Sequence, residues 1–252
     1  MERINRLTKP ALVIFIFLIF PFIDITSPFH GITLNKANGS DYIRMLEKLD
    51  NYDLLDEIVV VPESPENPAA VTRMVTRLNH IDRSLLRLMA AQQVKVRLFE
   101  GRLTDEPLLY HLKWKQPRGW RQDTTWEEVP GAGGGWLVSA KIGASLPGNG
   151  NGHGAFNLEL HETGHTIYRL LGTVPRLAEQ MEQNWKEEAA KLFPGDDYFL
   201  TYPSEYFSEV FAYYYAGKAS KQTVSEKAPQ TYRFFTRLKQ LDSSSIPPYY
   251  FN

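Results

Sequence analysis

The chain has 252 residues, 43% of them hydrophobic, which is enough to bury a core and corresponds to one domain or a compact pair. Its 28 basic and 29 acidic residues leave a formal net charge of -1, so there is no global basic field to attract nucleic acid or acidic lipid. The absence of cysteine excludes disulfides, thiolate zinc sites and cysteine nucleophiles. Any metal must therefore be held by His, Asp or Glu.

The N-terminus has the features of an export signal. Basic residues in "MERINRLTK" precede the uncharged apolar run "ALVIFIFLIFPFI" at residues 11–23. This run is shorter than the about 20 residues that span a bilayer and matches the apolar region of a secretory signal. No small-x-small cleavage site follows it, so for residues 1–30 an uncleaved N-terminal membrane anchor is the alternative to a signal peptide. We expect the protein to be secreted, or held at the outer face of the plasma membrane by this segment alone.

The next part of the chain, about 40–145, mixes helical and strand patterns. Residues 41–53 have helical spacing, and residues 56–62 form a short apolar run that ends in proline, as in a buried strand. Residues 66–93 predict one or two amphipathic helices, because Val71, Met74, Val75 and Leu78 fall on one stripe.

Two further strands and a long loop follow. "VKVRLFEG" (94–101) alternates between apolar and polar residues and predicts a strand. Residues 115–136 are rich in Gly, Pro and Trp and have no period, so they predict a long loop. Residues 136–145 return to a strand pattern.

The C-terminal part is expected to be helical from about 155 to 242. A helix from about Ala155 to Leu171 is predicted to end with Gly172 as its C-cap, and three more helices are predicted over residues 174–194, 203–217 and 228–241. The fold class is therefore α+β, with a small mixed sheet and a helical C-terminal half. Residues 31–252 are expected to form a single domain.

The first predicted C-terminal helix contains the motif "LELHETGH", with His161, Glu162 and His165. Residues four apart share one helix face, so the two imidazoles can bind one ion. Glu162 can reach a water in the fourth position, as in metal-activated hydrolases, whereas Glu159 should point away from the metal. Gly164 costs the helix about 1 kcal/mol relative to Ala, which indicates that another backbone or a ligand approaches there.

A third ligand is expected from the aromatic helix at 203–217. Glu205 and Glu209 share a narrow stripe on a helix that is otherwise strongly apolar. Buried carboxylates need a cation, a donor or a metal. We favour Glu205 as the third ligand and Glu209 as an acceptor that orients a ligand histidine. The alternative is an exposed carboxylate stripe with no ligand role.

Several separated segments resemble one known family. "NLELHETGH", "YFLTYPSEYFSEVFAYYY" and "KAPQTYRFF" are similar in order and spacing to the catalytic domain of anthrax toxin lethal factor-like metallopeptidases, a group that includes the secreted Pro-Pro endopeptidases of Gram-positive bacteria. Upstream, "PRGW", "TWEEVPGAGG" and "AKIG" resemble the same group, so the resemblance covers about residues 40–242.

The resemblance implies a zincin-like metallopeptidase domain that binds one Zn²⁺ per chain through His161, His165 and Glu205. Glu162 would be the general base. Tyr198, seven residues before Glu205, would donate a hydrogen bond to the oxyanion, with Tyr202 as its rival. The expected function is zinc-dependent endopeptidase, acting on a protein or peptide substrate with a preference for proline by analogy with the family.

Substrate contacts are expected from the strand and loop that precede the active-site helix. The strand at 136–143, including Lys141, would form the edge of the cleft and pair with an extended substrate. The loop at 116–135 would lie over the substrate, with Trp120, Trp126 and Trp136 stacking on prolines. We expect a monomer. The alternative function is a non-catalytic exported module, such as a zinc-binding or toxin-like attachment domain.

Overall fold

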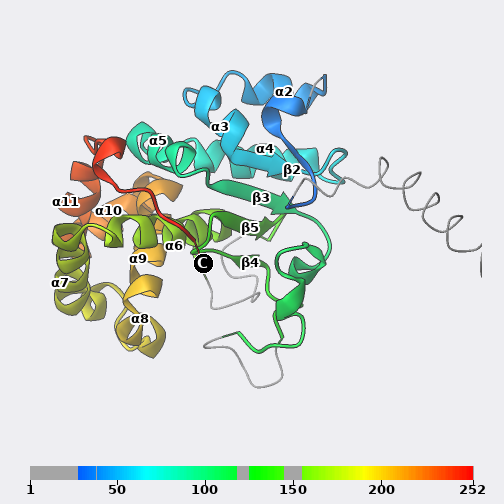
Figure 1. Ribbon diagram of the computed structural model, residues 1–252. Coiled ribbons are helices and arrows are strands. Elements are labelled where there is room, and N and C mark those ends of the chain that lie inside the picture. The colour runs from blue at the N-terminus through cyan, green and yellow to red at the C-terminus, as the bar shows by residue number, and fades with distance from the viewer. Residues whose placement is uncertain (1–27, 38, 118–124, 145–154, 252) are drawn as a thin grey trace, which may run out of the picture.

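The computed structural model describes residues 28–37, 39–117, 125–144 and 155–251 (Figure 1). The apolar run of the predicted export segment and Trp120 lie outside the described residues. Among the residues that are described, no helix combines the length and apolar character needed to cross a membrane.

One five-stranded mixed sheet forms the middle of the described fold. Its strands are β1 (Ile32–Thr33), β2 (Val59–Val61), β3 (Lys95–Phe99), β4 (Gly131–Ala132) and β5 (Leu137–Lys141). The order across the sheet is β1-β2-β3-β5-β4. The three central strands are parallel, whereas β1 and β4 run antiparallel to their neighbours at the two edges.

Helices surround the sheet and fill the C-terminal half. The α-helices are α2 (Asp41–Leu46), α3 (Tyr52–Ile58), α4 (Pro68–Leu78), α5 (Arg83–Ala91), α6 (Leu158–Gly172), α7 (Pro175–Leu192), α8 (Asp197–Thr201), α9 (Pro203–Ala216), α10 (Lys218–Lys227) and α11 (Pro229–Leu238). The 3₁₀ turns are η2 (Leu34–Lys36), η3 (Leu103–Asp105), η4 (Tyr110–Leu112) and η5 (Ser243–Ser245).

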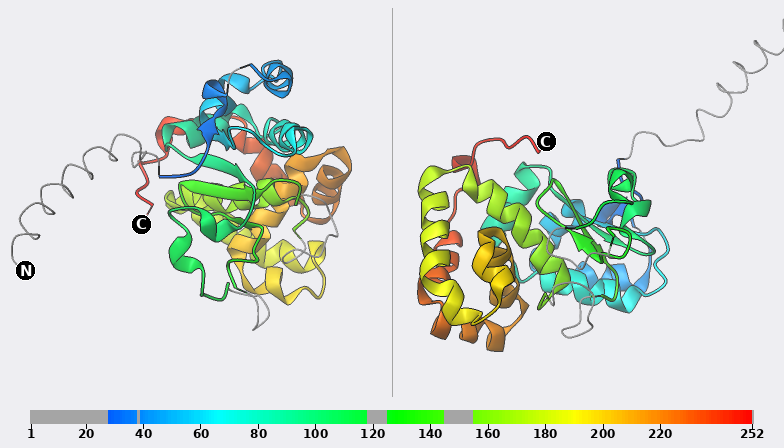
Figure 2. Two further views of the ribbon diagram at one scale, coloured as in Figure 1. Left: turned by 90° about the vertical axis from the view of Figure 1, so that its right-hand side faces the viewer. Right: turned by 90° about the horizontal axis from the view of Figure 1, so that it is seen from below.

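Helix α6 connects the two halves of the molecule. It packs against β5 on one side and against α9 on the other, so it lies between the sheet and the C-terminal helices. Figure 1 shows α7 to α11 gathered on the left, and the view from below in Figure 2 shows the same separation from the sheet. Residues on α6 are therefore in reach of both halves.

The two faces of the sheet bury different clusters. Side chains alternate between the faces along a strand. Leu98 of β3 and Ala140 of β5 belong to the main core, which also contains the apolar residues of α6 and α9. Phe99, next to Leu98, belongs to a second cluster with Leu103 and Val129. The segment around η3 and η4 therefore covers the sheet face opposite α6.

The α+β class predicted from the sequence is confirmed, with differences at several elements. The expected helix at 41–53 is two helices, and α3 continues to Ile58, so that only the β-branched Val59–Val61 is strand. The long loop at 115–136 contains β4, and helices α8 and α10 were not predicted. Gly172 lies inside α6, and the C-cap is Thr173.

Candidate metal centre

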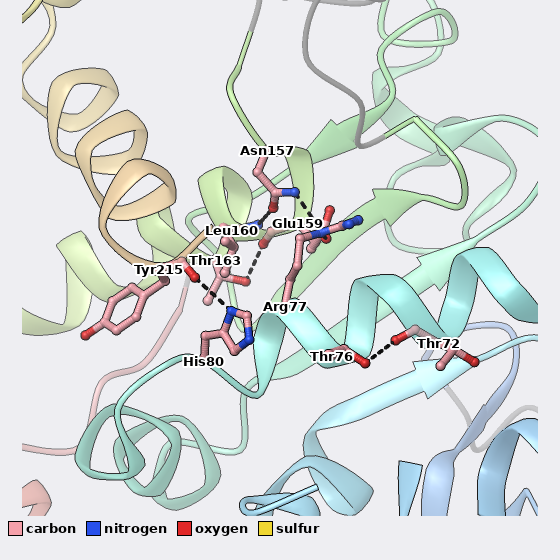
Figure 3. A network of polar contacts seen from close by, with 9 residues as sticks. All are labelled: Thr72, Thr76, Arg77, His80, Asn157, Glu159, Leu160, Thr163 and Tyr215. Carbon is pink, nitrogen blue, oxygen red and sulfur yellow. Dashed lines mark hydrogen bonds and ion pairs between the residues drawn. The ribbon is translucent and has the colours of Figure 1, made fainter. Parts of the chain in front are cut away.

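The start of α6 is fixed by polar contacts on the side facing α4. The Asn157 side chain caps the helix by accepting from the Leu160 N–H at 3.1 Å. Glu159 is fully buried and accepts from Arg77 Nε of α4 at 2.5 Å (Figure 3). Burial raises the pKa of the Glu159 carboxyl and Arg77 lowers it. Glu159 is therefore paired with α4 and is not one of the metal ligands, as expected from its position in the motif.

A close crossing of α6 and α9 brings the predicted ligands together. A Cβ atom on Gly164 would lie 2.8 Å from the Cα of Ser208, so only glycine permits this approach. Helix α9 starts with Pro203 at its first position, which places Glu205 in the first turn, about one turn before Ser208. The glycine in the middle of the motif thus sets the distance between the two helices.

Three side chains from these helices converge. His161 Nε2 and His165 Nε2 lie 3.1 Å apart. Glu205 Oε2 lies 3.4 Å from His161 Nε2 and 3.2 Å from His165 Nε2. His161 and Glu205 are buried, whereas His165 is half-buried, so the cluster is open on the His165 side. The structure thus brings the three predicted ligands into one possible metal site.

The donor set fits a zinc-sized ion. Zinc binds imidazole nitrogen and carboxylate oxygen at about 2.0–2.2 Å in a tetrahedron, which requires ligand atoms roughly 3.3–3.5 Å apart. The three observed separations, 3.1, 3.4 and 3.2 Å, are close to that spacing. Two nitrogens and one oxygen are also the ligand types that leave one corner for water in catalytic zinc sites.

Glu209 orients one of the histidines. Its Oε2 lies 2.8 Å from Nδ1 of His161, and its Oε1 accepts from the Phe156 N–H at 2.7 Å. A carboxylate at Nδ1 keeps the proton on that nitrogen, so the lone pair of Nε2 is directed toward Glu205 and His165. This is the geometry expected of the orienting acceptor predicted at Glu209.

The charges of the centre favour a bound cation. Burial lowers the pKa of His161, but hydrogen bonds to Glu205 and Glu209 outweigh it and raise that pKa to about 10. Burial raises the pKa of Glu205, and the two histidines hold it well below its usual range. Without metal, Glu205 and Glu209 therefore hold a proton on His161. A metal ion can replace such protons, since its ligands must be deprotonated.

Glu162 lies beside the centre, under a glycine-rich segment. It is buried, and a Cβ on Gly131 of β4 would lie 2.9 Å from its Cγ. Burial raises the pKa of Glu162, while His161 and His165 lower it. A carboxylate with a raised pKa next to a metal site is suited to general-base catalysis.

The same glycine-rich segment is attached to α6 by a residue that the sequence analysis did not identify. Thr166 Oγ1 accepts from the Gly134 N–H at 3.1 Å and donates to the Gly135 carbonyl at 2.8 Å. The "GAGGG" run before a strand was the available signal, because closely spaced glycines often mark a backbone lying against another element. Thr166 thus holds β4 and its following turn over Glu162.

Both candidate tyrosines lie between α7 and α9. Tyr198 is in α8, and Tyr202 is the residue between α8 and α9. Both are half-buried, and their rings make an edge contact with centroids 5.4 Å apart. Their assignment as oxyanion donor stays a prediction.

The candidate substrate residues are placed differently from the expected arrangement. The strand expected at the cleft edge, β5, is interior, because the unpredicted β4 pairs with its outer side. The edge prediction for 136–143 is therefore wrong.

The three predicted substrate-binding side chains of the described chain do not gather at the metal centre. Lys141 pairs with Phe99 in register and is exposed. Trp126 packs against the second cluster, and Trp136 is half-buried with its ring 6.4 Å from that of Phe29. Lys141 and Trp126 thus belong to the sheet face opposite α6.

The other histidines of the described part of the chain lie at the surface. His30, His80 and His111 are exposed. His80 makes a contact of 3.1 Å from Nδ1 to the carbonyl oxygen of Tyr215 (Figure 3).

Comparisons with known proteins show the family of this chain. The family model for the N- and C-terminal domain of anthrax toxin lethal factor matches residues 46–238. A Pro-Pro endopeptidase of Clostridioides difficile (strain 630) is 38% identical over 189 residues, which are 75% of this chain and 84% of that protein. A Pro-Pro endopeptidase of Paenibacillus alvei is 35% identical over 186 residues, which are 73% of this chain and 84% of that protein.

A solved structure shows the same fold. The structure of the Pro-Pro endopeptidase PPEP-2 from Paenibacillus alvei superimposes with a TM-score of 0.65 at 34% identity and covers 73% of this chain and 99% of that one. The family match spans strands β2 to β5, the histidine helix α6 and the glutamate helix α9 together. The chain therefore belongs to the anthrax toxin lethal factor family.

Proposed function

We propose that this chain is an exported zinc-dependent endopeptidase that hydrolyses peptide bonds near prolines. The observation that carries the proposal is the convergence of His161, His165 and Glu205 with ligand atoms within 4.8 Å of one another. Glu162, next to His161 in the chain, supplies a buried carboxyl of raised pKa. The Pro-Pro endopeptidase names of two relatives support the reaction and the preference for proline.

Zinc, when bound, supplies a Lewis acid that acidifies water and polarises the scissile carbonyl. His161, His165 and Glu205 would hold the ion, and Glu209 keeps the His161 ring in the orientation and tautomer that binding requires. Glu162 accepts the proton of the attacking water and passes it to the leaving amine. The Tyr198 hydroxyl donates a hydrogen bond to the developing oxyanion.

The sheet offers an extended substrate a strand to pair with. Strand β4 is the edge next to α6, and Gly131 of β4 lies against Glu162. A peptide added to this edge would run past the general base with its backbone paired, which is how extended peptides bind to open sheet edges. β4 thus takes the role that the sequence analysis gave to residues 136–143.

Export is proposed from the composition of the N-terminal segment. Basic residues followed by the apolar run at 11–23 fit a secretory signal or an uncleaved anchor. Either would place the peptidase outside the cell or at the outer face of its membrane.

The decisive test is Glu162→Gln, which keeps the shape of the side chain and removes the base. We expect zinc content to stay at one ion per chain and turnover of a proline-rich peptide to fall by about 10²–10⁴-fold. Glu182→Gln, exposed on α7, is the matched control and should cleave like the wild type. A Glu162→Gln variant with undiminished turnover would refute the mechanism. Zinc-loaded wild type that cleaves nothing in an unbiased peptide library would favour the non-catalytic module instead.

Two phenylalanine variants separate the tyrosines. Removing a hydroxyl that donates to the oxyanion should lower kcat by about 10²–10³-fold with little change in KM. We expect this result for Tyr198→Phe and a near-normal kcat for Tyr202→Phe. The reverse pattern in steady-state kinetics would transfer the role to Tyr202.

A further inference from the structure

The segment around η4 presents an exposed apolar surface. Leu108, Tyr110 and Trp114 are 40%, 64% and 79% exposed, and they are three of the five large hydrophobic side chains exposed in the described part of the chain. Lys113 Nζ lies 5.1 Å from the ring centroid of Trp114 and 6.0 Å from that of Tyr110, so one ammonium bridges both rings. These four residues are called the aromatic surface below. Their clustering distinguishes them from scattered surface hydrophobics, which need no explanation.

The fold fixes the outward direction of these side chains. Consecutive turns hold the segment, with the Leu109 N–H bonded to the Glu106 carbonyl at 2.9 Å and the Leu112 N–H to the Leu109 carbonyl at 2.9 Å. Leu109 packs into the second cluster against Phe99 and Leu103. With Leu109 turned inward, Tyr110 and Trp114, four residues apart, project outward on one side.

The aromatic surface is separate from the candidate metal centre. Its segment covers the second cluster, on the sheet face opposite α6, whereas His161 and His165 lie on α6. A peptide bound at β4 beside Glu162 contacts the α6 side of the sheet. The exposed rings are therefore available for a different contact.

The aromatic surface lies where the N-terminal segment joins the described fold. The His30 N–H donates to Glu106 Oε2 at 3.1 Å, and Glu106 is itself buried against Arg97, with Nη2 to Oε1 at 3.3 Å. Glu106 is two residues before Leu108, and Figure 2 shows the blue start of the described chain on the same side as the green η3–η4 segment. The apolar run ends at residue 23, so seven residues, at most about 25 Å of extended chain, separate it from this attachment point.

We propose that the aromatic surface rests in the headgroup region of the membrane when the apolar run holds the chain there. This inference rests on the anchored form of the proposed function. Trp and Tyr are the side chains enriched at membrane interfaces. A thirteen-residue run is short for a span, and a second contact strengthens a weak anchor. Because the chain has a net charge of -1, it is not attracted to acidic lipid, and the contact would depend on insertion of the rings.

The test uses the full chain, which has no cysteine, so a single introduced cysteine can carry a nitroxide label. Trp114→Cys reports on the aromatic surface, and Lys186→Cys, exposed on α7 in the C-terminal half, is the matched control. Both labelled proteins are reconstituted into phosphatidylcholine vesicles. Collision of the label with oxygen, which concentrates in lipid, is compared with collision with a water-soluble nickel complex. We expect oxygen to be favoured several-fold at residue 114 and the nickel complex to be favoured at residue 186.

Flotation of the vesicles and a soluble-peptide assay accompany the measurement. A chain that floats with vesicles while residue 114 is as accessible to nickel as residue 186 overturns the inference, and so does a chain that does not float. A label at 114 that responds to added proline-rich peptide and not to vesicles would make this a protein-binding surface instead. Trp114→Ser should leave cleavage of a soluble peptide unchanged, so loss of membrane contact and failure of the peptidase proposal give different results.

Discussion

Two buried glutamates in the C-terminal half, Glu188 and Glu205, have opposite surroundings. Glu188 of α7 accepts from the Gln230 N–H at 2.8 Å, the Thr231 N–H at 2.9 Å and the Thr231 hydroxyl at 2.8 Å, all at the start of α11. Glu205 of α9 faces two imidazole nitrogens at 3.4 and 3.2 Å. Both carboxylates are at most 5% exposed.

The difference shows that the type of neighbour, and not burial alone, separates a structural carboxylate from a candidate ligand. Backbone N–H groups at a helix N-terminus always carry their protons, so the donors that face Glu188 are permanent. Imidazole nitrogens can carry either a proton or a metal, so the environment of Glu205 depends on which of the two is present.

The largest effects are expected when each of these two glutamates is replaced with glutamine. Glu205→Gln should lower zinc affinity by more than the roughly 10- to 100-fold that loss of an outer partner costs, and peptidase activity should disappear with the metal. Glu188→Gln should keep zinc and activity but lower the free energy of unfolding by about 2 kcal/mol, because an amide cannot accept all three donors. Metal content by elemental analysis and urea unfolding give the two readouts.

The comparison fails if the two variants behave alike. Zinc retained at wild-type affinity in Glu205→Gln would remove that residue from the ligand set. Zinc lost from Glu188→Gln, with the fold intact, would show that α11 rather than the α6–α9 crossing determines the site.

A pH series on metal-free protein tests the second half of the comparison. The pKa of His161 is raised from 6.5 to about 10, so its contribution to stability is complete below pH 6.5 and is lost as the pH rises through 10. The pKa of Glu205 is lowered, so its contribution changes only in acid, outside this window. We expect the free energy of unfolding of the metal-free protein to fall by roughly a few kcal/mol between pH 6 and pH 10, as measured by urea unfolding.

Zinc-saturated protein is the control for this series, since the metal has already displaced the proton and the loss should be smaller. Glu205→Gln should also flatten the dependence, because it removes one carboxylate that holds the proton. A metal-free wild type with constant stability over this range would show that His161 is not protonated in the folded chain.

The sequence was informative where chemistry repeats at helical spacing. His161 and His165 could be proposed because residues four apart share one helix face, and Glu205 because unpartnered buried charge is costly on an apolar helix. The structure brings the three together. The same reasoning gave no role to Glu188, because its donors lie 42 residues further along the chain. A contact of this kind depends on how α7 meets α11.

The sheet edge was the main failure, for a different reason. β4 has two residues, Gly131 and Ala132, which is too short for any alternation to appear, and its pairing with β5 depends on tertiary contacts. That pairing also places Trp126 and Lys141 on the sheet face opposite α6, which the sequence did not predict. The pairing of a strand as short as β4 therefore could not be predicted from the sequence.

The smallest expected effect compares two glycines of α6. Gly164→Ala would place a methyl group 2.8 Å from the Cα of Ser208 and 3.2 Å from the Cβ of Phe211. The about 1–3 kcal/mol cost of overpacking is partly offset by the roughly 1 kcal/mol better helix propensity of Ala. Gly172→Ala meets nothing within 4 Å and should stabilise by up to about 1 kcal/mol. Because α9 carries Glu205, only Gly164→Ala should also weaken zinc binding in a chelator competition. Equal effects of both variants would mean that the helix crossing does not set the geometry of the ligands.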